Sequence, residues 1–138
     1  MKDVSDILGR IFISIMFYYE VLDTLIFYEN TKETMTSYGV TWCQDILLIS
    51  IIVILLIGST MVAIGYSSRF GAVLLLLYIV PFTFIVYSFW NDPQELQQLN
   101  MLYFMRNLAI MGGLLLLLAH GSGRYSVKRL IHVMRLPK

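Results

Sequence analysis

The chain has 138 residues, of which 58% are hydrophobic and only 14% are charged, and its net charge is +1. Soluble domains are about 45–50% apolar and about 25% charged, so this composition argues against a soluble fold and for one small integral membrane domain over 1–138. The single cysteine, Cys43, excludes an internal disulfide and a cage of thiolate metal ligands.

The first apolar run extends over about 7–28. It carries Arg10, Glu20 and Asp23, but residues 11–19 are uncharged. No small-residue cleavage site follows it, so we expect this run to be retained as a membrane span and not removed as a signal peptide.

Three further apolar runs follow at about 46–68, 70–91 and 101–120, and the first two of these contain no charged residue. A helix of about 20 residues crosses the roughly 30 Å hydrocarbon core of a bilayer. Lipid offers no partner to backbone N–H and C=O groups, so runs of this length must be helical. The predicted fold is therefore all-α, an integral membrane bundle of four transmembrane helices.

The basic residues are distributed unevenly. Four spans place both termini and the 66–70 connection on one side of the membrane, and the 29–45 and 91–100 connections on the other. The first side holds Lys2, Arg10, Arg69, Arg124, Lys128, Arg129, Arg135 and Lys138. The second side holds only Lys32, with Arg106 near it, so the positive-inside rule predicts that both termini are cytoplasmic.

The tail, 125–138, combines apolar residues at i, i+3, i+4 and i+7 with basic residues between them. This pattern predicts a short amphipathic helix on the cytoplasmic leaflet. The simpler alternative is a positive-inside anchor without lipid specificity.

Arg106 is unusual because a guanidinium remains charged inside hydrocarbon, at a cost of a few kcal/mol. Glu20 and Asp23 share one face of the first helix and fall at a similar depth under the four-span topology. We therefore predict an intramembrane charge cluster of Glu20, Asp23 and Arg106, in which the guanidinium pairs with a carboxylate. The cluster either pins the first helix to the fourth or lines a site for a substrate, proton or quinone, and both alternatives stay open.

Aromatic side chains gather near the same membrane interface as this cluster. They form either an aromatic belt or a ring-stacking pocket. In the second case, the candidate ligand pocket consists of Tyr87, Trp90, Tyr103 and Asn107.

Metal and nucleic-acid sites are not predicted. His120 and His132 are too few and too differently placed for a metal or haem site. The chain has no Walker loop, no GxGxxG motif and no catalytic triad, and nothing in it indicates nucleic-acid binding.

Five stretches, between about residue 7 and residue 130, resemble the DoxX family of small bacterial inner-membrane proteins. They are "LGRIFISIMF" at 8–17, "GYSSRFGAVLLLL" at 65–77, "TFIVYSFWND" at 83–92, "FMRNLAIMGGLLLL" at 104–117 and "GSGRYSVKRL" at 121–130. The resemblance implies a four-helix fold in the bacterial inner membrane and an association with quinone-linked oxidoreductase complexes. It also implies a relation to eukaryotic proteins that act as cargo receptors or assembly factors.

The chain departs from the DoxX pattern at two places. Many members have a Glu where this chain has Leu55, and His-Asn where it has Tyr87 and Ser88. We therefore expect no catalysis by the chain alone and assign no catalytic residue. The leading functional hypothesis is an accessory subunit of a membrane complex, such as a quinone-linked oxidoreductase. The alternative is a small-solute transporter or a cargo-binding or assembly membrane protein.

The expected surroundings follow from these hypotheses. The partners are the lipid bilayer and either further copies of the chain or another membrane protein. A bound quinone or lipid is the candidate cofactor, and no metal or haem is expected.

Overall fold

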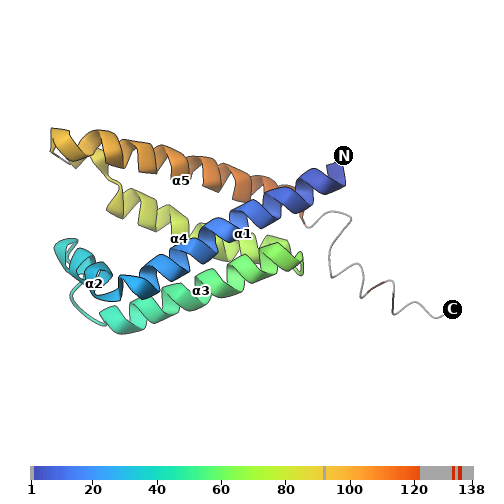
Figure 1. Cartoon of the computed structure of the whole chain (residues 1–138), viewed down its shortest axis with the longest axis horizontal. Helices are drawn as coiled ribbons and strands as arrows, with labels where there is room; N and C mark the ends of the chain where they lie inside the picture. Colours follow the sequence, from blue (N-terminus) through green and yellow to red (C-terminus); the bar gives the residue numbers. More distant parts are fainter. Residues whose placement is uncertain (1, 92, 122–131, 133, 135–138) are drawn as a thin grey trace.

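The structure is a computed structural model that describes residues 2–91, 93–121, 132 and 134. Its elements in this part of the chain are all helical (Figure 1). They are α1 (Lys2–Ile26), α2 (Tyr28–Ser37), α3 (Gln44–Ile64), α4 (Ser68–Val86), the short 3-10 helix η1 (Phe89–Asn91) and α5 (Gln94–His120). We call the end of the bundle that carries α2, η1 and the start of α5 the α2 end.

Three of these helices, α3, α4 and α5, are each long and apolar enough to cross a membrane. Helix α1 meets the same test only together with α2, from which it is bent by 89°. The prediction of an all-α membrane bundle is thus confirmed, with three spans or four according to how this bent pair is counted.

Two predicted connections are largely helical in the structure. The 29–45 connection contains α2, whose threonine hydroxyls donate back to carbonyls one turn earlier, as Thr34 does to Asn30 at 2.9 Å. The 91–100 connection is mostly the first two turns of α5, which begins after Pro93 with Gln and Glu residues that favour helix. The Asp-Pro turn of the second connection already suggested that a short interfacial helix begins there, whereas hydropathy missed α2, because polar residues can form a helix without being apolar. The predicted tail helix, 125–138, lies outside the described residues except at positions 132 and 134.

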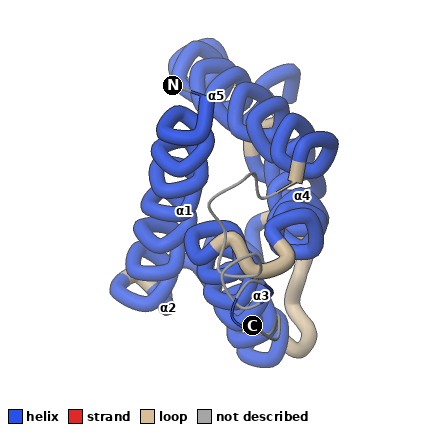
Figure 2. The backbone as a smooth tube through the Cα atoms, turned by 90° about the vertical axis from the view of Figure 1, so that its right-hand side faces the viewer, coloured by secondary structure: helices blue, strands red, loops and turns tan. Residues whose placement is uncertain are grey.

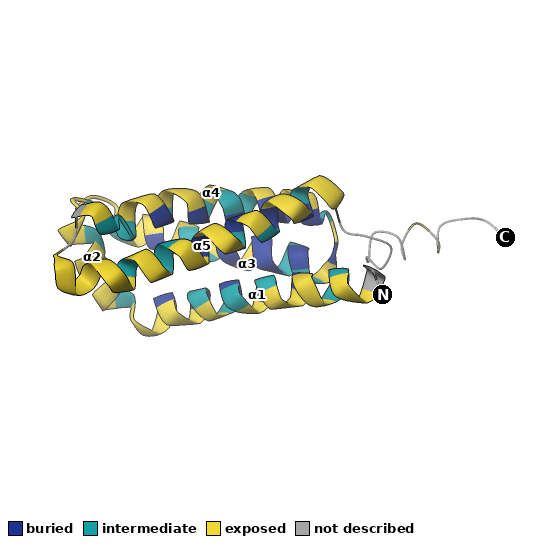
Figure 3. Cartoon of the chain, turned by 90° about the horizontal axis from the view of Figure 1, so that it is seen from above, coloured by how far each residue is buried: buried dark blue, intermediate teal, exposed yellow. Residues whose placement is uncertain are grey.

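The helices pack in a fixed order around the bundle. Helix α3 lies between α1 and α4, and α4 lies between α3 and α5 (Figure 2). Buried side chains face the interior, whereas most of the outward surface is exposed and apolar (Figure 3). The core is formed by Phe17, Val21, Leu55, Val62, Ala72, Leu75, Ile79, Met111, Leu114 and Leu117.

Helices α3 and α4 approach each other closely where both carry glycine. A Cβ atom on Gly71 would lie 2.8 Å from the carbonyl oxygen of Gly58 and 3.0 Å from Cβ of Met61. Small residues at membrane helix interfaces permit this approach and maximise van der Waals contact. The chain then leaves α3 through Gly65, whose φ of +75° is readily adopted by glycine.

Helix α5 is longer than its neighbour α4 and extends past it at the α2 end (Figure 1). Tyr87, directly after α4, lies against Tyr103 of α5, with ring centres 5.3 Å apart. Residues 94–102 therefore extend about 13 Å beyond the end of α4. At the opposite end, Arg69 donates to the Ala119 carbonyl at 3.5 Å, where a cation complements the negative end of the helix dipole.

Replacing Gly71 by alanine is expected to lower the free energy of unfolding by about 1–3 kcal/mol, because the added methyl group overpacks the α3–α4 contact. The measurement is loss of helical circular dichroism on titration with a denaturing detergent. Gly112→Ala is the control, since nothing lies within 4 Å of the Cβ position there. Equal stability of the two variants would contradict the prediction.

Candidate functional site

Glu20 lies on α1 at a half-buried position that faces α4. The hydroxyl group of Tyr78, on α4, donates a hydrogen bond to Oε1 of Glu20 at 3.3 Å. The carboxylate is therefore held inside the bundle by a neutral phenol.

Arg106 lies on α5, is exposed, and is held by its neighbours on the same helix. Its Nε and Nη2 both donate to Oδ1 of Asn107 at 3.4 Å, and its Cζ lies 5.0 Å from the centre of the Tyr103 ring. Asn107 is buried and in turn donates to the Thr83 hydroxyl at 3.0 Å, which donates to the Ile79 carbonyl at 2.6 Å. A chain of hydrogen bonds from α4 thus positions the guanidinium.

Four rings connect the neighbourhood of Glu20 to that of Arg106. Tyr78 stacks on Phe82 at 5.2 Å between ring centres, Phe82 meets Tyr87 at 5.7 Å, and Tyr87 meets Tyr103 at 5.3 Å. We call these four residues the aromatic row.

The predicted ion pair between Arg106 and Glu20 or Asp23 is not formed in the part of the chain that the structure describes, where the ion pairs join other residues. The reason is the packing order. Helix α1 packs on α3 and α5 packs on α4, so α1 and α5 are not neighbours at the α2 end. Helices α1 and α5 approach each other further from the α2 end, where a Cβ on Gly113 would lie 3.4 Å from Cδ1 of Ile13. Asp23 is exposed on α1.

The predicted ligand pocket is brought together only in part. Tyr87 and Tyr103 do meet, within the aromatic row. Asn107 is buried behind Arg106 and supports it. Trp90 lies outside the row, because it packs on Phe104 with ring centres 6.1 Å apart, in a separate aromatic group at η1.

Three residues of the site were missed from the sequence, Tyr78, Phe82 and Thr83. Thr83 continues the buried stripe of α4 that includes Leu75 and Ile79, so its spacing could have indicated a hydroxyl facing the interior. The burial of Arg10, which pairs with Asp6 at 3.3 Å, was also not anticipated. Among the residues described, no group of three or more His, Cys, Asp or Glu side chains is placed to hold a metal.

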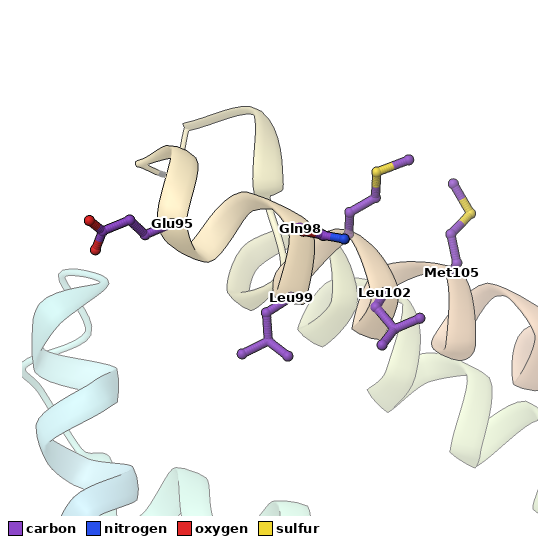
Figure 4. A pocket seen from close by; sticks show the side chains of 6 residues that line it. Glu95, Gln98, Leu99, Leu102 and Met105 are labelled. Atoms are coloured by element: carbon purple, nitrogen blue, oxygen red, sulfur yellow. The ribbon is translucent and has the colours of Figure 1, made fainter.

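An open depression of about 550 Å³ lies along the projecting end of α5 and is lined by residues of this helix alone; we call it the groove (Figure 4). Leu99 and Leu102 point to one side of the helix and Met105 to the other, with Glu95 at the end toward α2. Its lining is completed by Gln98 and Met101. Glu95, Leu99, Leu102 and Arg106 share one face of α5 by helical spacing, but Arg106 is not part of the lining of the groove.

The family model described as the SURF4 family matches residues 1–131 of this chain. The chain belongs to the SURF4 family.

Relatives of this SURF4-family chain fall into two length classes. The Escherichia coli inner membrane protein YqjF is 30% identical over 132 residues, which are 96% of this chain and 95% of YqjF. The Surfeit locus protein 4 homolog of Schizosaccharomyces pombe is 33% identical over 91 residues, which are 64% of this chain but 29% of that protein. The ER-derived vesicles protein ERV29 of Saccharomyces cerevisiae is 32% identical over 76 residues, which are 55% of this chain and 24% of ERV29. No solved structure gives a significant match.

The resemblance to the DoxX family is thereby corrected, because the SURF4 model covers nearly the whole chain. The motifs that suggested DoxX are short and rich in Gly, Leu and aromatic residues. Such residues are common wherever helices pack closely in lipid, so these motifs discriminate poorly between families of membrane bundles. The hypothesis of a quinone-linked oxidoreductase subunit rested on that resemblance and loses its support with it.

Thr83→Val is expected to lower the free energy of unfolding by about 0.6–2 kcal/mol, the range seen for hydrogen bonds between membrane helices. Valine keeps the shape of threonine but offers no acceptor to the buried Asn107 side chain. Chemical unfolding in detergent measures the effect. Thr34→Val serves as the control, because that hydroxyl donates within α2 to Asn30. A loss no greater than in the control would show that Asn107 has another partner.

Proposed function

We propose that this SURF4-family chain is a multi-pass protein of the bacterial inner membrane that binds a partner protein as cargo at the α2 end. The observation that carries the proposal is the exposed leucine and methionine groove on the part of α5 that extends past α4. Relatedness to an ER-derived vesicles protein supports it, and so does the match to YqjF, a bacterial inner membrane protein.

The position of the groove distinguishes it from an ordinary lipid-facing surface. Helix α4, with 19 residues, is about 29 Å long and matches the hydrocarbon core, so the projecting residues 94–102 extend into the headgroup layer or water. Leu96, Leu99 and Leu102 are nevertheless 51%, 45% and 65% exposed. Exposed apolar patches outside the hydrocarbon mark sites of protein interaction.

The groove also defines the chemistry of the partner. Leucine and methionine side chains offer an adaptable apolar surface, as methionine does in surfaces that bind varied partners. Glu95 at the rim adds one negative charge. The fitting partner is therefore a segment with apolar side chains toward Leu99 and Leu102 and a basic group toward Glu95.

Helix α2 is fixed beside this surface by polar contacts. Asp45 pairs with Lys32 at 2.7 Å and accepts a hydrogen bond from Tyr28 at 2.8 Å, and the Tyr38 hydroxyl donates to the Val86 carbonyl at 2.9 Å. These contacts tie α2 to α3 and α4. The α2 end can thus present a preorganised surface, which reduces the entropy lost on binding.

A photoreactive residue in place of Leu99 is expected to give a covalent adduct with one defined protein in living cells, because this side chain would contact the cargo. The same residue in place of Leu116, which is exposed near the other end of α5, is the matched control and should react with lipid. Mass spectrometry identifies the adducts, and Glu95→Lys should suppress the protein adduct. Lipid adducts alone at both positions would refute the cargo-binding proposal.

The α2 end is expected to face away from the cytoplasm, as the distribution of basic residues predicts. Cys43 is the sole cysteine of the chain and is exposed at this end, so a membrane-impermeant thiol reagent should label it in spheroplasts. Cys43→Ser should abolish the label. Labelling that requires permeabilised membranes would reverse the orientation.

A further inference from the structure

We propose that Glu20, Arg106 and the aromatic row form a second binding site, separate from the groove, for a small zwitterionic group that carries one ammonium and one oxyanion. The site goes beyond cargo binding, since it lies within the membrane part of the bundle.

Both charges lie on the membrane side of the C-terminal end of α4, which is at Val86. Tyr78, which holds Glu20, is eight residues before Val86 and so about 12 Å inside that end. Arg106 is about one turn beyond Tyr103, which is level with the end of α4. Ionisable residues at such depths are costly and are usually matched by a partner charge.

Neither charge has a partner of opposite charge at ion-pair distance within the described part of the chain. Each is instead held by neutral groups, Glu20 by Tyr78 and Arg106 by Asn107 and the Tyr103 ring. The arrangement is one fixed negative and one fixed positive group, with tyrosine rings between them.

The opposite signs of the two charges select the type of ligand. A simple anion at Arg106 would be repelled by Glu20, and more weakly by Asp23 one turn further along α1. A simple cation at Glu20 would be repelled by Arg106. A zwitterion satisfies both ends and brings no net charge into the bilayer.

The side chains present suit both groups of such a ligand. A guanidinium has five N–H donors, and those not directed at Asn107 can bind an oxyanion. An ammonium at Glu20 would be attracted by the carboxylate, beside the Tyr78 hydroxyl. Arg106 is exposed, so its outward side is accessible to a ligand that approaches from the bilayer or from the α2 end.

Two sources of this chemistry exist, a phospholipid headgroup and a free solute. The test is isothermal titration of the purified full chain in detergent with three probes. Lysophosphatidylethanolamine carries the zwitterion on a lipid tail, glycerophosphoethanolamine carries it without a tail, and lysophosphatidylglycerol carries only the anion. Wild type should bind at least one zwitterionic probe about tenfold more tightly than the anionic one, the factor of one charge-assisted hydrogen bond.

The variants assign the two ends of the ligand. Glu20→Gln should weaken the zwitterionic probe about tenfold and strengthen the anionic probe, because it removes the repulsion by Glu20, whereas Arg106→Gln should weaken both. Glu95→Gln, in the groove, is the matched control and should change neither. If Glu20→Gln does not fold, as judged by circular dichroism, Tyr78→Phe replaces it, because it removes the hydroxyl that positions the carboxylate and should reduce the preference for zwitterions.

The outcomes separate the alternatives. Binding of the tailed probe alone identifies a lipid headgroup, and equal binding of both zwitterionic probes identifies a solute. Equal affinity for the anionic probe, or no binding of any probe, overturns the proposal. A photoreactive residue in place of Tyr103 that captures the protein captured at Leu99 would also overturn it, because the cluster would then belong to the cargo surface. Loss of the Leu99 adduct, by contrast, refutes only the cargo proposal.

Discussion

The close contact between α3 and α4 at Gly58 and Gly71 is the constraint on which the arrangement of the bundle depends. Two helices that touch through backbone and small side chains cannot separate without losing most of their van der Waals contact, which drives association in lipid. Helix α1 packs on one side of this pair and α5 on the other. The pair therefore keeps α1 and α5 apart at the α2 end.

This separation has an electrostatic consequence. Glu20 on α1 and Arg106 on α5 would neutralise each other if their helices were neighbours, but each is held by uncharged groups of its own. Placing two unpaired charges at membrane depth is unfavourable, and a membrane protein that retains them commonly uses them. The hydrogen bonds that Arg106 donates to Asn107, and that Asn107 donates to the buried Thr83 hydroxyl, show that the guanidinium is positioned and not simply tolerated.

The α2 end presents two surfaces of different character. The groove on the projecting part of α5 is apolar, open and beyond the end of α4, whereas the charge cluster lies within the membrane part of the bundle. The bacterial relative YqjF matches this chain over nearly its full length, whereas the match covers less than a third of the longer yeast relatives. The match therefore spans nearly all of YqjF and only part of the two yeast proteins.

The amino-acid sequence by itself determined the helical membrane fold, because uncharged runs of more than 20 residues have no other stable form in lipid. It also identified Glu20 and Arg106 as exceptional, since the cost of charge in hydrocarbon depends only on residue type and depth. It did not determine which helices are neighbours. That depends on where small residues let two helices touch, as Gly58 and Gly71 do, and composition and hydropathy do not encode such contacts. Only the tertiary structure therefore decided that Tyr78 and Asn107, and not an ion pair, hold the two charges.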